Sequence, residues 1–161
     1  MIVQLTQGYV AHVDRADYPL VMFFKWCVSR GHGRNLYAET RSCGRKFYMH
    51  RFLMGEPDGV EVDHRDRDGL NNRRKNLRLS DRSKNLANCG IRSDNTTGFK
   101  GVYFFGGTRK KKWCAKVVHR GKTHYAGYHA TPAIAARHYN AKARELHGEF
   151  ASFNNVTPRF P

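Results

Sequence analysis

Residues 61–85 read EVDHRDRDGLNNRRKNLRLSDRSKN, and this stretch decides how the rest of the chain is interpreted. Alternating valines lead into Asp63 and His64, which predicts a strand that ends on a carboxylate beside an imidazole. A polar, Asn-rich turn follows, and the alternating run LRL at 77–79 predicts a second strand. A helix is then expected to start at Asp81. The stretch therefore predicts a β-hairpin that leads into a helix.

A hairpin and helix of this kind can gather Asp63, His64 and Asn85 around one cation. His64 is the natural general base, because imidazole titrates near neutral pH. Asp63 and Asn85 offer hard oxygen ligands, which favour Mg²⁺ or Mn²⁺ over zinc. Asn76, between the strands, is expected to bond the loop backbone and to hold His64 in one orientation. Hydrolysis of a phosphodiester needs both a base and a cation, so the residues predict a small metal-dependent nuclease site.

The segment resembles HNH homing endonucleases of the phage and intron-encoded type. The resemblance is carried by VDH, which ends at His64, by the phrase NRRKNLR at 72–78, and by Asn85 in place of a final His. It implies that Asp63 and Asn85 bind the metal and that His64 is the general base. It also implies that Asn76 braces the hairpin.

The charge of the chain indicates a polyanionic partner. The 161 residues carry 29 basic and 13 acidic side chains, a formal net charge of +16. This excess points to nucleic acid, since no long apolar run or basic amphipathic helix supports a membrane. Residues 1–90 hold 16 basic and 10 acidic residues, a net of +6, and residues 91–161 hold 13 and 3, a net of +10. The C-terminal part is therefore expected to be the dedicated DNA-binding module.

The cysteines and the N-terminus favour a reducing compartment. None of the four cysteines forms a C-x-x-C pair, so a structural zinc is not expected. Nothing resembles a signal peptide, and we expect the protein to act in the cytoplasm of a bacterium or of a phage-infected host cell. We expect a monomer that uses no small-molecule cofactor.

Residues 1–46 are interpreted as a β-rich lead-in that supports the hairpin. Hydrophobic alternation predicts its strands at 2–5, 9–13, 26–28 and 36–38. Residues 47–55 (FYMHRFLMG) predict a short helix that ends at Gly55. His50 on this helix is interpreted as structural, although a contact with DNA or with the metal site stays open.

Residues 91–97 are polar and turn-rich and are taken as a linker. The part from 98 to 154 predicts three strands and one helix. Thr131 and Pro132 predict the helix start, and Gly148 its end. The strands are expected at 99–105, 113–119 and 122–128. Residues 155–161 are taken as a tail.

One face of this predicted sheet is left for DNA, where Lys and Arg contact phosphates and aromatic side chains stack on bases or contact methyl groups. The residues predicted to bind DNA, three of them in the hairpin, are Arg73, Arg74, Arg78, Lys100, Tyr103, Arg109, Lys111, Lys112, Trp113, Lys116, Arg120, Lys122 and Tyr125.

The C-terminal part resembles the plant ethylene-response-factor (Apetala-two) DNA-binding domain, over about residues 98–154. The matching phrases are GFKGV at 98–102, KW-x-A at 112–115, Gly127, AAR-x-YN at 135–140, Ala143 and GEFA-x-FN at 148–154. The resemblance implies major-groove binding through the sheet. Tyr103, Phe105, Val118 and Thr123 stand where the plant domain often has Arg, so the plant target sequence is not carried over.

The predicted fold class is α+β. It comprises a ββα-metal HNH nuclease region (47–90) behind the lead-in, then a three-stranded antiparallel sheet packed on one helix. The predicted activity is metal-dependent hydrolysis of duplex DNA by a homing-type endonuclease. Two alternatives stay open: an inactive, sequence-specific DNA-binding regulator, and an RNA-binding or ribosome-associated protein.

Overall fold

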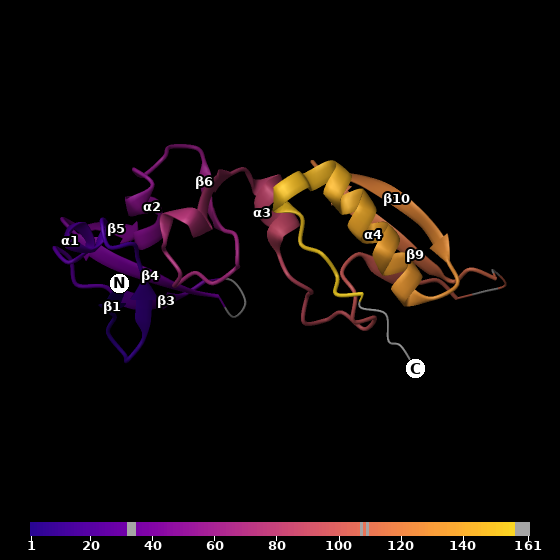
Figure 1. Cartoon of the computed structure of the whole chain (residues 1–161), viewed down its shortest axis with the longest axis horizontal. Coiled ribbons are helices and arrows are strands. Elements are labelled where there is room, and N and C mark those ends of the chain that lie inside the picture. The colour runs from indigo at the N-terminus through magenta and orange to yellow at the C-terminus, as the bar shows by residue number, and fades with distance from the viewer. Residues whose placement is uncertain (32–34, 107, 109, 157–161) are drawn as a thin grey trace. The chain divides into compact units, whose positions relative to one another are not determined.

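Figure 1 shows the computed structural model of the chain, which describes residues 1–31, 35–106, 108 and 110–156. The chain divides into two compact units, Met1–Asp81 and Arg82–Pro161. Small antiparallel sheets and helices make up both units, which confirms the α+β class. Among the described helices, none combines the length and the apolar character needed to cross a membrane.

The first unit starts with a two-stranded ribbon and a three-stranded meander. Strand β1 (Ile2–Gln4) pairs with β2 (Val10–His12), and β3 (Cys27–Arg30), β4 (Leu36–Ser42) and β5 (Arg45–Tyr48) form the meander. The core is built from side chains of these strands, of α1 (Tyr18–Val21) and of the segments that adjoin them. It includes Val3, Ala11, Val13, Val21, Trp26, Ala38 and Met49.

The helix predicted at 47–55 is shorter than expected. Phe47 and Tyr48 belong to β5, and only Met49–Leu53 forms the helix α2. A two-residue turn at Cys43 and Gly44, with φ of 48° and 73°, folds β5 back on β4. Such a turn suits a tight hairpin, so strand pairing overrides the local helical pattern.

Strand β6 (Glu61–His64) pairs with β7 (Leu77–Ser80) as the sequence predicted. Val62 and Leu77 turn into the core of the first unit. A short 3₁₀ turn, η1 (Arg74–Asn76), leads directly into β7. The buried apolar residues hold the hairpin register, because a slip of one residue would turn them to the other face.

The second unit packs one long helix on a three-stranded sheet. Its sheet has the order β10 (Lys122–His129), β9 (Trp113–His119), β8 (Val102–Phe104), all antiparallel. Helix α4 (Pro132–His147) lies across one face (Figure 1). Alanines at the contact let helix and sheet approach closely. The core residues are Val102, Ala115, Val117, Ala135, Ala136, Tyr139 and Ala143.

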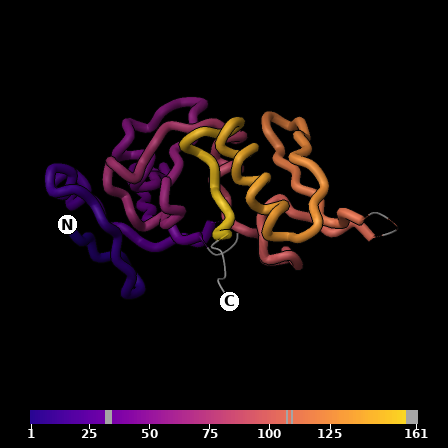
Figure 2. Tube along the Cα trace, turned by 45° about the vertical axis from the view of Figure 1, so that its right-hand side comes forward, coloured from indigo at the N-terminus to yellow at the C-terminus, as the bar shows by residue number. Residues whose placement is uncertain are grey.

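Several side chains of the second unit explain phrases in its sequence pattern. Gly101 has φ of +71°, and a Cβ there would collide with the Tyr139 ring. After α4 the chain folds back beside it (Figure 2). In this returning segment, Asn154 forms hydrogen bonds with Lys100 and with Asn140. Asn154 Oδ1 accepts from the Lys100 backbone N at 2.6 Å, and Asn140 Nδ2 donates to the Asn154 carbonyl at 2.9 Å.

Helix α3 (Arg82–Asn88) belongs to the second unit, so the division falls before the expected 91–97 linker. The backbone N of Ser152 donates to the Ala87 carbonyl at 3.3 Å, and Ser83 Oγ accepts from the Arg120 backbone N at 3.0 Å. Lys84 Nζ lies 5.3 Å from the centre of the Phe150 ring. Contacts distant in sequence therefore determine where α3 belongs.

Candidate active site

Asp63 and His64 are adjacent on β6, and each is only 5% exposed. The β6–β7 pairing places Arg78 opposite Asp63 and Leu77 opposite His64. Because neighbouring residues of a strand point to opposite faces, the two side chains meet different surroundings. The hairpin thus gives each of them its own set of partners.

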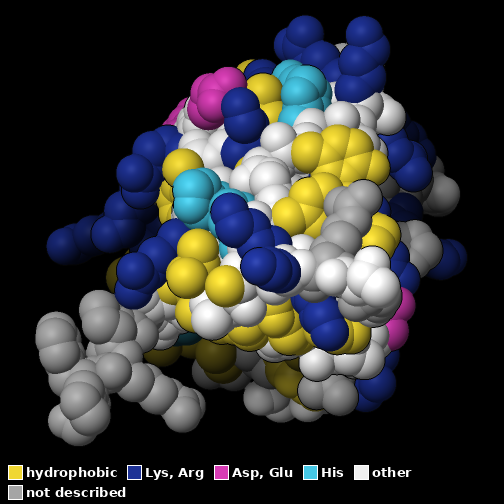
Figure 3. All heavy atoms as spheres, turned by 90° about the vertical axis from the view of Figure 1, so that its right-hand side faces the viewer, with side chains coloured by type: hydrophobic (Ala, Val, Ile, Leu, Met, Phe, Trp, Pro, Cys, Tyr) yellow, Lys and Arg dark blue, Asp and Glu magenta, His cyan; other side chains and the backbone are white. Residues whose placement is uncertain are grey.

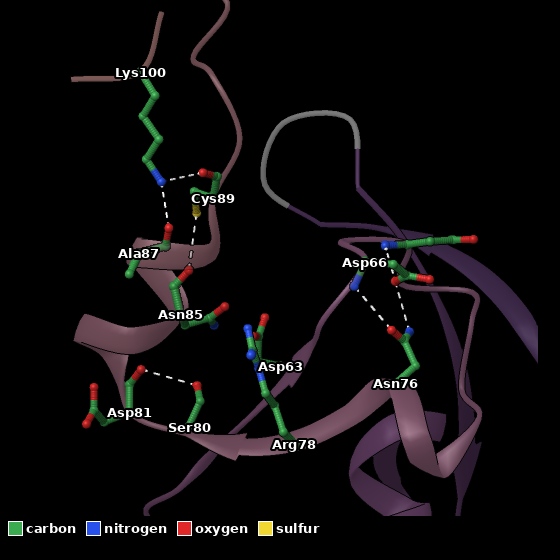
Figure 4. Close-up of polar contacts among 11 residues, drawn as sticks. Asp63, Asp66, Asn76, Arg78, Ser80, Asp81, Asn85, Ala87, Cys89 and Lys100 are labelled. Carbon is green, nitrogen blue, oxygen red and sulfur yellow. Dashed lines mark hydrogen bonds and ion pairs between the residues drawn. The ribbon is translucent and has the colours of Figure 1, made fainter. Parts of the chain in front are cut away.

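Arg78 is the ion-pair partner of Asp63. Its Nη2 and Nε lie 2.7 and 2.9 Å from Asp63 Oδ2, and both side chains are only 6% exposed (Figure 4 labels the two residues). This position differs from the predicted role of Arg78 as a phosphate contact, because a buried guanidinium that is engaged by a carboxylate is not presented to DNA. The sequence had no signal for this pair beyond the hairpin register.

His64 sits in a buried, mainly aromatic environment. Its Nε2 lies 3.3 Å from Asn72 Oδ1, and its ring centre lies 4.9 Å from that of His50 and 5.9 Å from that of Tyr37. Burial lowers the pKa of His64 below its ordinary 6.5, against the opposing effects of the Asn72 hydrogen bond and nearby aspartates such as Asp66. His64 is therefore neutral near pH 7, which is the state that a general base requires.

Asn72 is the site residue that sequence reasoning missed. It is fully buried, its backbone N donates to the His12 carbonyl at 2.7 Å, and its Nδ2 donates to the Leu70 carbonyl at 3.2 Å. The sequence predicted that Asn76 orients His64, but the side chain that contacts the His64 ring nitrogen is that of Asn72. An Asn pair in a polar segment is indistinguishable from ordinary turn residues in sequence, so the available signal was weak.

Asn76 braces the loop between the strands (Figure 4). Its Nδ2 donates to the Asn71 carbonyl at 2.7 Å and to Asp66 Oδ1 at 2.9 Å, and its Oδ1 accepts from the Asp66 backbone N at 3.1 Å. Asp66 Oδ2 also accepts from Asn71 Nδ2 at 2.6 Å. Asn76 thus holds the loop that carries Asn72 and acts on His64 only through it.

Two arginines of the loop that were predicted to bind DNA also contact neighbouring side chains. Arg74 Nε and Nη2 donate to the Asp17 carboxylate at 2.8–3.1 Å, and the Arg74 backbone N donates to Asp14 Oδ2 at 2.8 Å. Arg73 Nη1 donates to Asn71 Oδ1 at 3.2 Å. Arg74 therefore joins the lead-in to the hairpin loop, while its side chain stays 55% exposed.

His50 is the most strongly perturbed histidine beside the hairpin. Burial, with smaller effects of His64 and Arg51, lowers its pKa to about 3. Its Nδ1 has no hydrogen-bond partner within the part of the chain that the structure describes. Its stacked contact with Tyr48, at 5.6 Å between ring centres, places it among aromatic side chains. The structural interpretation of His50 fits this burial.

The stability of the first unit is expected to fall on mild acidification because of His50. In the unfolded chain His50 takes up a proton near pH 6.5, whereas in the fold it stays neutral down to about pH 3. The free energy of unfolding is therefore unaffected by His50 above pH 6.5. It decreases as the pH falls below that value, by about 2 kcal/mol at about pH 5. Chemical unfolding measured at the two pH values checks this result.

The His50→Phe variant is expected to lose this share of the pH dependence, and His138→Phe, at an exposed position, to retain it. Equal pH dependence in wild type and His50→Phe would contradict the assignment.

Asn85 lies on α3 of the second unit and is half-buried. Its carbonyl accepts from Cys89 Sγ at 3.5 Å. Lys100, predicted to bind DNA, instead closes the C-terminal end of this helix: its Nζ donates to the carbonyls of Ala87 at 2.6 Å and Cys89 at 2.5 Å (Figure 4). A cation at a helix C-terminus satisfies carbonyls that lack partners within the helix.

The face of the C-terminal sheet turned away from α4 carries three of the predicted DNA-binding side chains. Lys116 pairs with Tyr125 across β9 and β10, and its Nζ lies 4.2 Å from the centre of the Tyr103 ring. Tyr103 is 44% exposed and Tyr125 is 63% exposed. This combination of cation and accessible rings suits contacts with phosphates and bases.

The remaining residues predicted on this sheet differ in position. Trp113 packs with the α4-side cluster and against Phe104, at 5.0 Å between ring centres, so it does not share the Tyr103 face. Arg109 lies outside the described residues. Four other predicted residues, at strand ends and turns, are exposed: Lys111, Lys112, Arg120 and Lys122. Figure 3 shows Lys and Arg side chains spread among hydrophobic ones, with few acidic side chains.

Among the described residues, no group of three or more His, Cys, Asp or Glu side chains is arranged to hold a metal ion. The predicted ligand set differs from such a group, since it combines one carboxylate with an Asn amide oxygen. Oxygen donors of this kind fit a hard divalent cation that keeps several waters.

Comparisons with known proteins identify the hairpin region. A model described as HNH endonuclease matches residues 52–87. An uncharacterised HNH endonuclease of Acanthamoeba polyphaga mimivirus is 34% identical over 156 residues, which cover 93% of this chain and 77% of the relative. Protein 3.8 of Escherichia phage T7 is 34% identical over 97 residues, which cover 60% of this chain and 78% of the relative. No solved structure matches.

Proposed function

The chain belongs to the HNH endonucleases and is a nuclease that hydrolyses phosphodiester bonds, and from this premise we propose a metal-dependent endonuclease of homing type that cleaves duplex DNA. The observation that carries the proposal is the Asp63–His64 pair at the end of β6, inside the matched residues 52–87. Burial keeps His64 neutral, so its imidazole can accept a proton near pH 7.

In this mechanism His64 takes a proton from a water molecule, and the water oxygen forms a bond to phosphorus. The bond from phosphorus to the 3′ oxygen breaks, and the leaving oxygen takes a proton from solvent. Asp63 and Asn85 are the proposed holders of one Mg²⁺ or Mn²⁺ ion. A bound divalent cation supplies positive charge that stabilises the phosphate and the departing oxygen. Asn76 keeps the loop in shape through its bonds to Asp66 and Asn71.

The second unit is proposed to hold the duplex through its sheet and basic turns, as its Apetala-two resemblance implies. The chemistry that supports this role is the exposed set Tyr103, Lys116 and Tyr125, together with a net charge of +10 over residues 91–161. We place the action of the protein, as a monomer, in the cytoplasm of a bacterium or infected host. The phage and mimivirus relatives support an association with viruses.

Incubation with supercoiled plasmid tests this proposal. Wild-type protein is expected to nick or linearise the plasmid with Mg²⁺ or Mn²⁺ and to leave it intact with EDTA. Matched duplex RNA should remain uncleaved. Cleavage that persists in EDTA would contradict metal dependence, and cleavage confined to RNA would contradict the substrate.

An inactive DNA-binding regulator is the second candidate, and the buried Arg78–Asp63 pair favours it. The guanidinium already engages the carboxylate that would serve as a metal ligand. In this case the protein would bind duplex DNA with strong salt dependence and would cleave it with neither metal.

Lys100 and Lys116 provide a matched test of the DNA-binding surface. Lys116→Met is expected to weaken duplex binding and to lower the slope of log K against log salt concentration by about 1. Lys100→Met is expected to leave that slope unchanged, because Lys100 Nζ is bonded to the carbonyls of Ala87 and Cys89. Its effect should instead be a loss of stability of about 1.5–3 kcal/mol, typical of hydrogen bonds to a charged group.

Binding isotherms at several salt concentrations, with thermal melts of each variant, check both expectations. A fall in the salt slope with Lys100→Met, at unchanged stability, would restore Lys100 as a phosphate contact.

A further inference from the structure

The bonds around Asn72 determine which nitrogen of His64 carries the proton. Asn72 Nδ2 donates to the Leu70 carbonyl at 3.2 Å, which turns its Oδ1 toward His64 Nε2 at 3.3 Å. An amide oxygen only accepts hydrogen bonds, so Nε2 must be the protonated nitrogen of the neutral ring. The lone pair of the neutral imidazole then lies on Nδ1.

Three further contacts fix this arrangement. The Asn72 backbone N donates to the His12 carbonyl at 2.7 Å, and a parallel β-bridge joins Asn71 to His12, so strand β2 anchors the residue. The Asn72 side chain is fully buried and cannot turn toward solvent. The ring of His50 meets the His64 ring edge-on, at 4.9 Å and 67°, and limits its rotation.

We propose that Asn72 is a positioning residue that holds the His64 imidazole in the Nε2–H tautomer and so makes Nδ1 the nitrogen that accepts the proton of the attacking water. This inference rests on the proposed function, in which His64 is the base. It also assigns a structural role to the β-rich lead-in, because His12 of β2 accepts a hydrogen bond from the backbone N of Asn72. A base that reacts through the wrong nitrogen or in the wrong orientation loses its reach to the water.

Substitution of Asn72 by Leu removes the acceptor while keeping a side chain of similar size. The Asn35→Leu variant is the control for an Asn-to-Leu change in the same unit, because Asn35 is exposed and lies outside the hairpin loop. Asn72→Asp keeps an acceptor oxygen and is the rescue variant. NMR spectra of the full-length chain, with ¹⁵N- and ¹³C-labelled histidine, report the tautomer of His64 independently of any cleavage.

Wild type and Asn35→Leu are expected to show one Nε2–H signal set for His64. In Asn72→Leu the signals should shift toward an average of both tautomers, and single-turnover cleavage should slow roughly 10–100-fold, the range found when a group that orients a site residue is removed. Asn72→Asp should recover most of the rate and the single signal set. Should the leucine variant unfold, Asn72→Ser is measured in the same way.

Unchanged His64 signals in Asn72→Leu or Asn72→Ser would overturn the inference, as would equal slowing by Asn35→Leu. The His64→Ala variant distinguishes a failure of the proposed function from a failure of the role of Asn72. If His64→Ala cleaves at the wild-type rate, the proposed function fails, whatever the tautomer. If His64→Ala is inactive while Asn72→Leu cleaves normally, only the role of Asn72 fails.

Discussion

His64→Ala is expected to cleave DNA roughly 100- to 10,000-fold more slowly than wild type, which is the rate enhancement that general base catalysis usually supplies. The physical reason is the buried environment of this imidazole, which lowers its pKa and leaves it neutral near pH 7. Loss of the ring leaves water without a proton acceptor. DNA affinity should be unchanged, since a buried ring contributes no phosphate contact.

The measurement pairs single-turnover cleavage with a binding isotherm for the same duplex. His138→Ala, which removes an exposed imidazole from the second unit, serves as the control and should cleave like wild type. If His64→Ala keeps the wild-type rate, another group is the base. If it loses binding in proportion to cleavage, His64 acts on DNA binding instead.

Arg78→Met is expected to destabilise the first unit by about 3–5 kcal/mol, the usual cost of removing one partner of a buried ion pair. Asp63 and Arg78 are each only 6% exposed, and Nη2 lies 2.7 Å from Oδ2. The substitution removes the guanidinium and leaves the Asp63 carboxylate in the same buried place. The expected loss of stability comes from this uncompensated buried charge and not from the net free energy that the ion pair contributes to folding.

A double-mutant cycle with Asp63→Asn measures the effect. The double variant should recover part of the loss of Arg78→Met, because a neutral amide in place of the Asp63 carboxylate no longer needs a cation, and the coupling should exceed the scatter of additive pairs. Arg92→Met, from the exposed pair with Asp94, should leave the unfolding midpoint unchanged. A small effect of Arg78→Met, equal to that of Arg92→Met, would contradict the buried pair.

Local signals predicted helix α4 and strand β9 well, although β8 covers only Val102–Phe104 of the strand expected at 99–105. Helix α4 begins after Thr131, whose side chain accepts from the Ile134 backbone N, and ends at Gly148 with φ of 54°. Strand β9 has the predicted bounds of 113–119. Each of these features depends on residues within one turn or one strand, which a single sequence displays.

Contacts between distant residues limited the rest. Phe47 and Tyr48 form a strand because β4 pairs with them, and Trp113 packs on the α4 side because the alternation of β9 places it with Ala115. The Lys100 amine donates to the carbonyl of Cys89, which follows α3 and lies 11 residues earlier in the sequence. No periodicity within a short window encodes such partners.

The candidate site likewise contains residues that the sequence identifies and partners that only the structure identifies. Asp63 and His64 stand out in sequence because a carboxylate beside an imidazole at a strand end has recognisable chemistry. The partners of that pair do not stand out: Arg78 resembled a phosphate contact, and Asn72 resembled a turn residue. Side chains that act on other side chains become visible only when the hairpin register and the loop are known.

Metal-triggered cleavage tests the proposed nuclease activity most directly. Protein and duplex DNA are combined in EDTA until binding is saturated, and excess Mg²⁺ then starts the reaction, for wild type beside His64→Ala. We expect both proteins to hold the DNA before Mg²⁺ is added and only wild type to convert it to cut product afterwards. Saturated binding followed by no cleavage in wild type, with either Mg²⁺ or Mn²⁺, would contradict the proposed activity and identify a DNA-binding regulator instead.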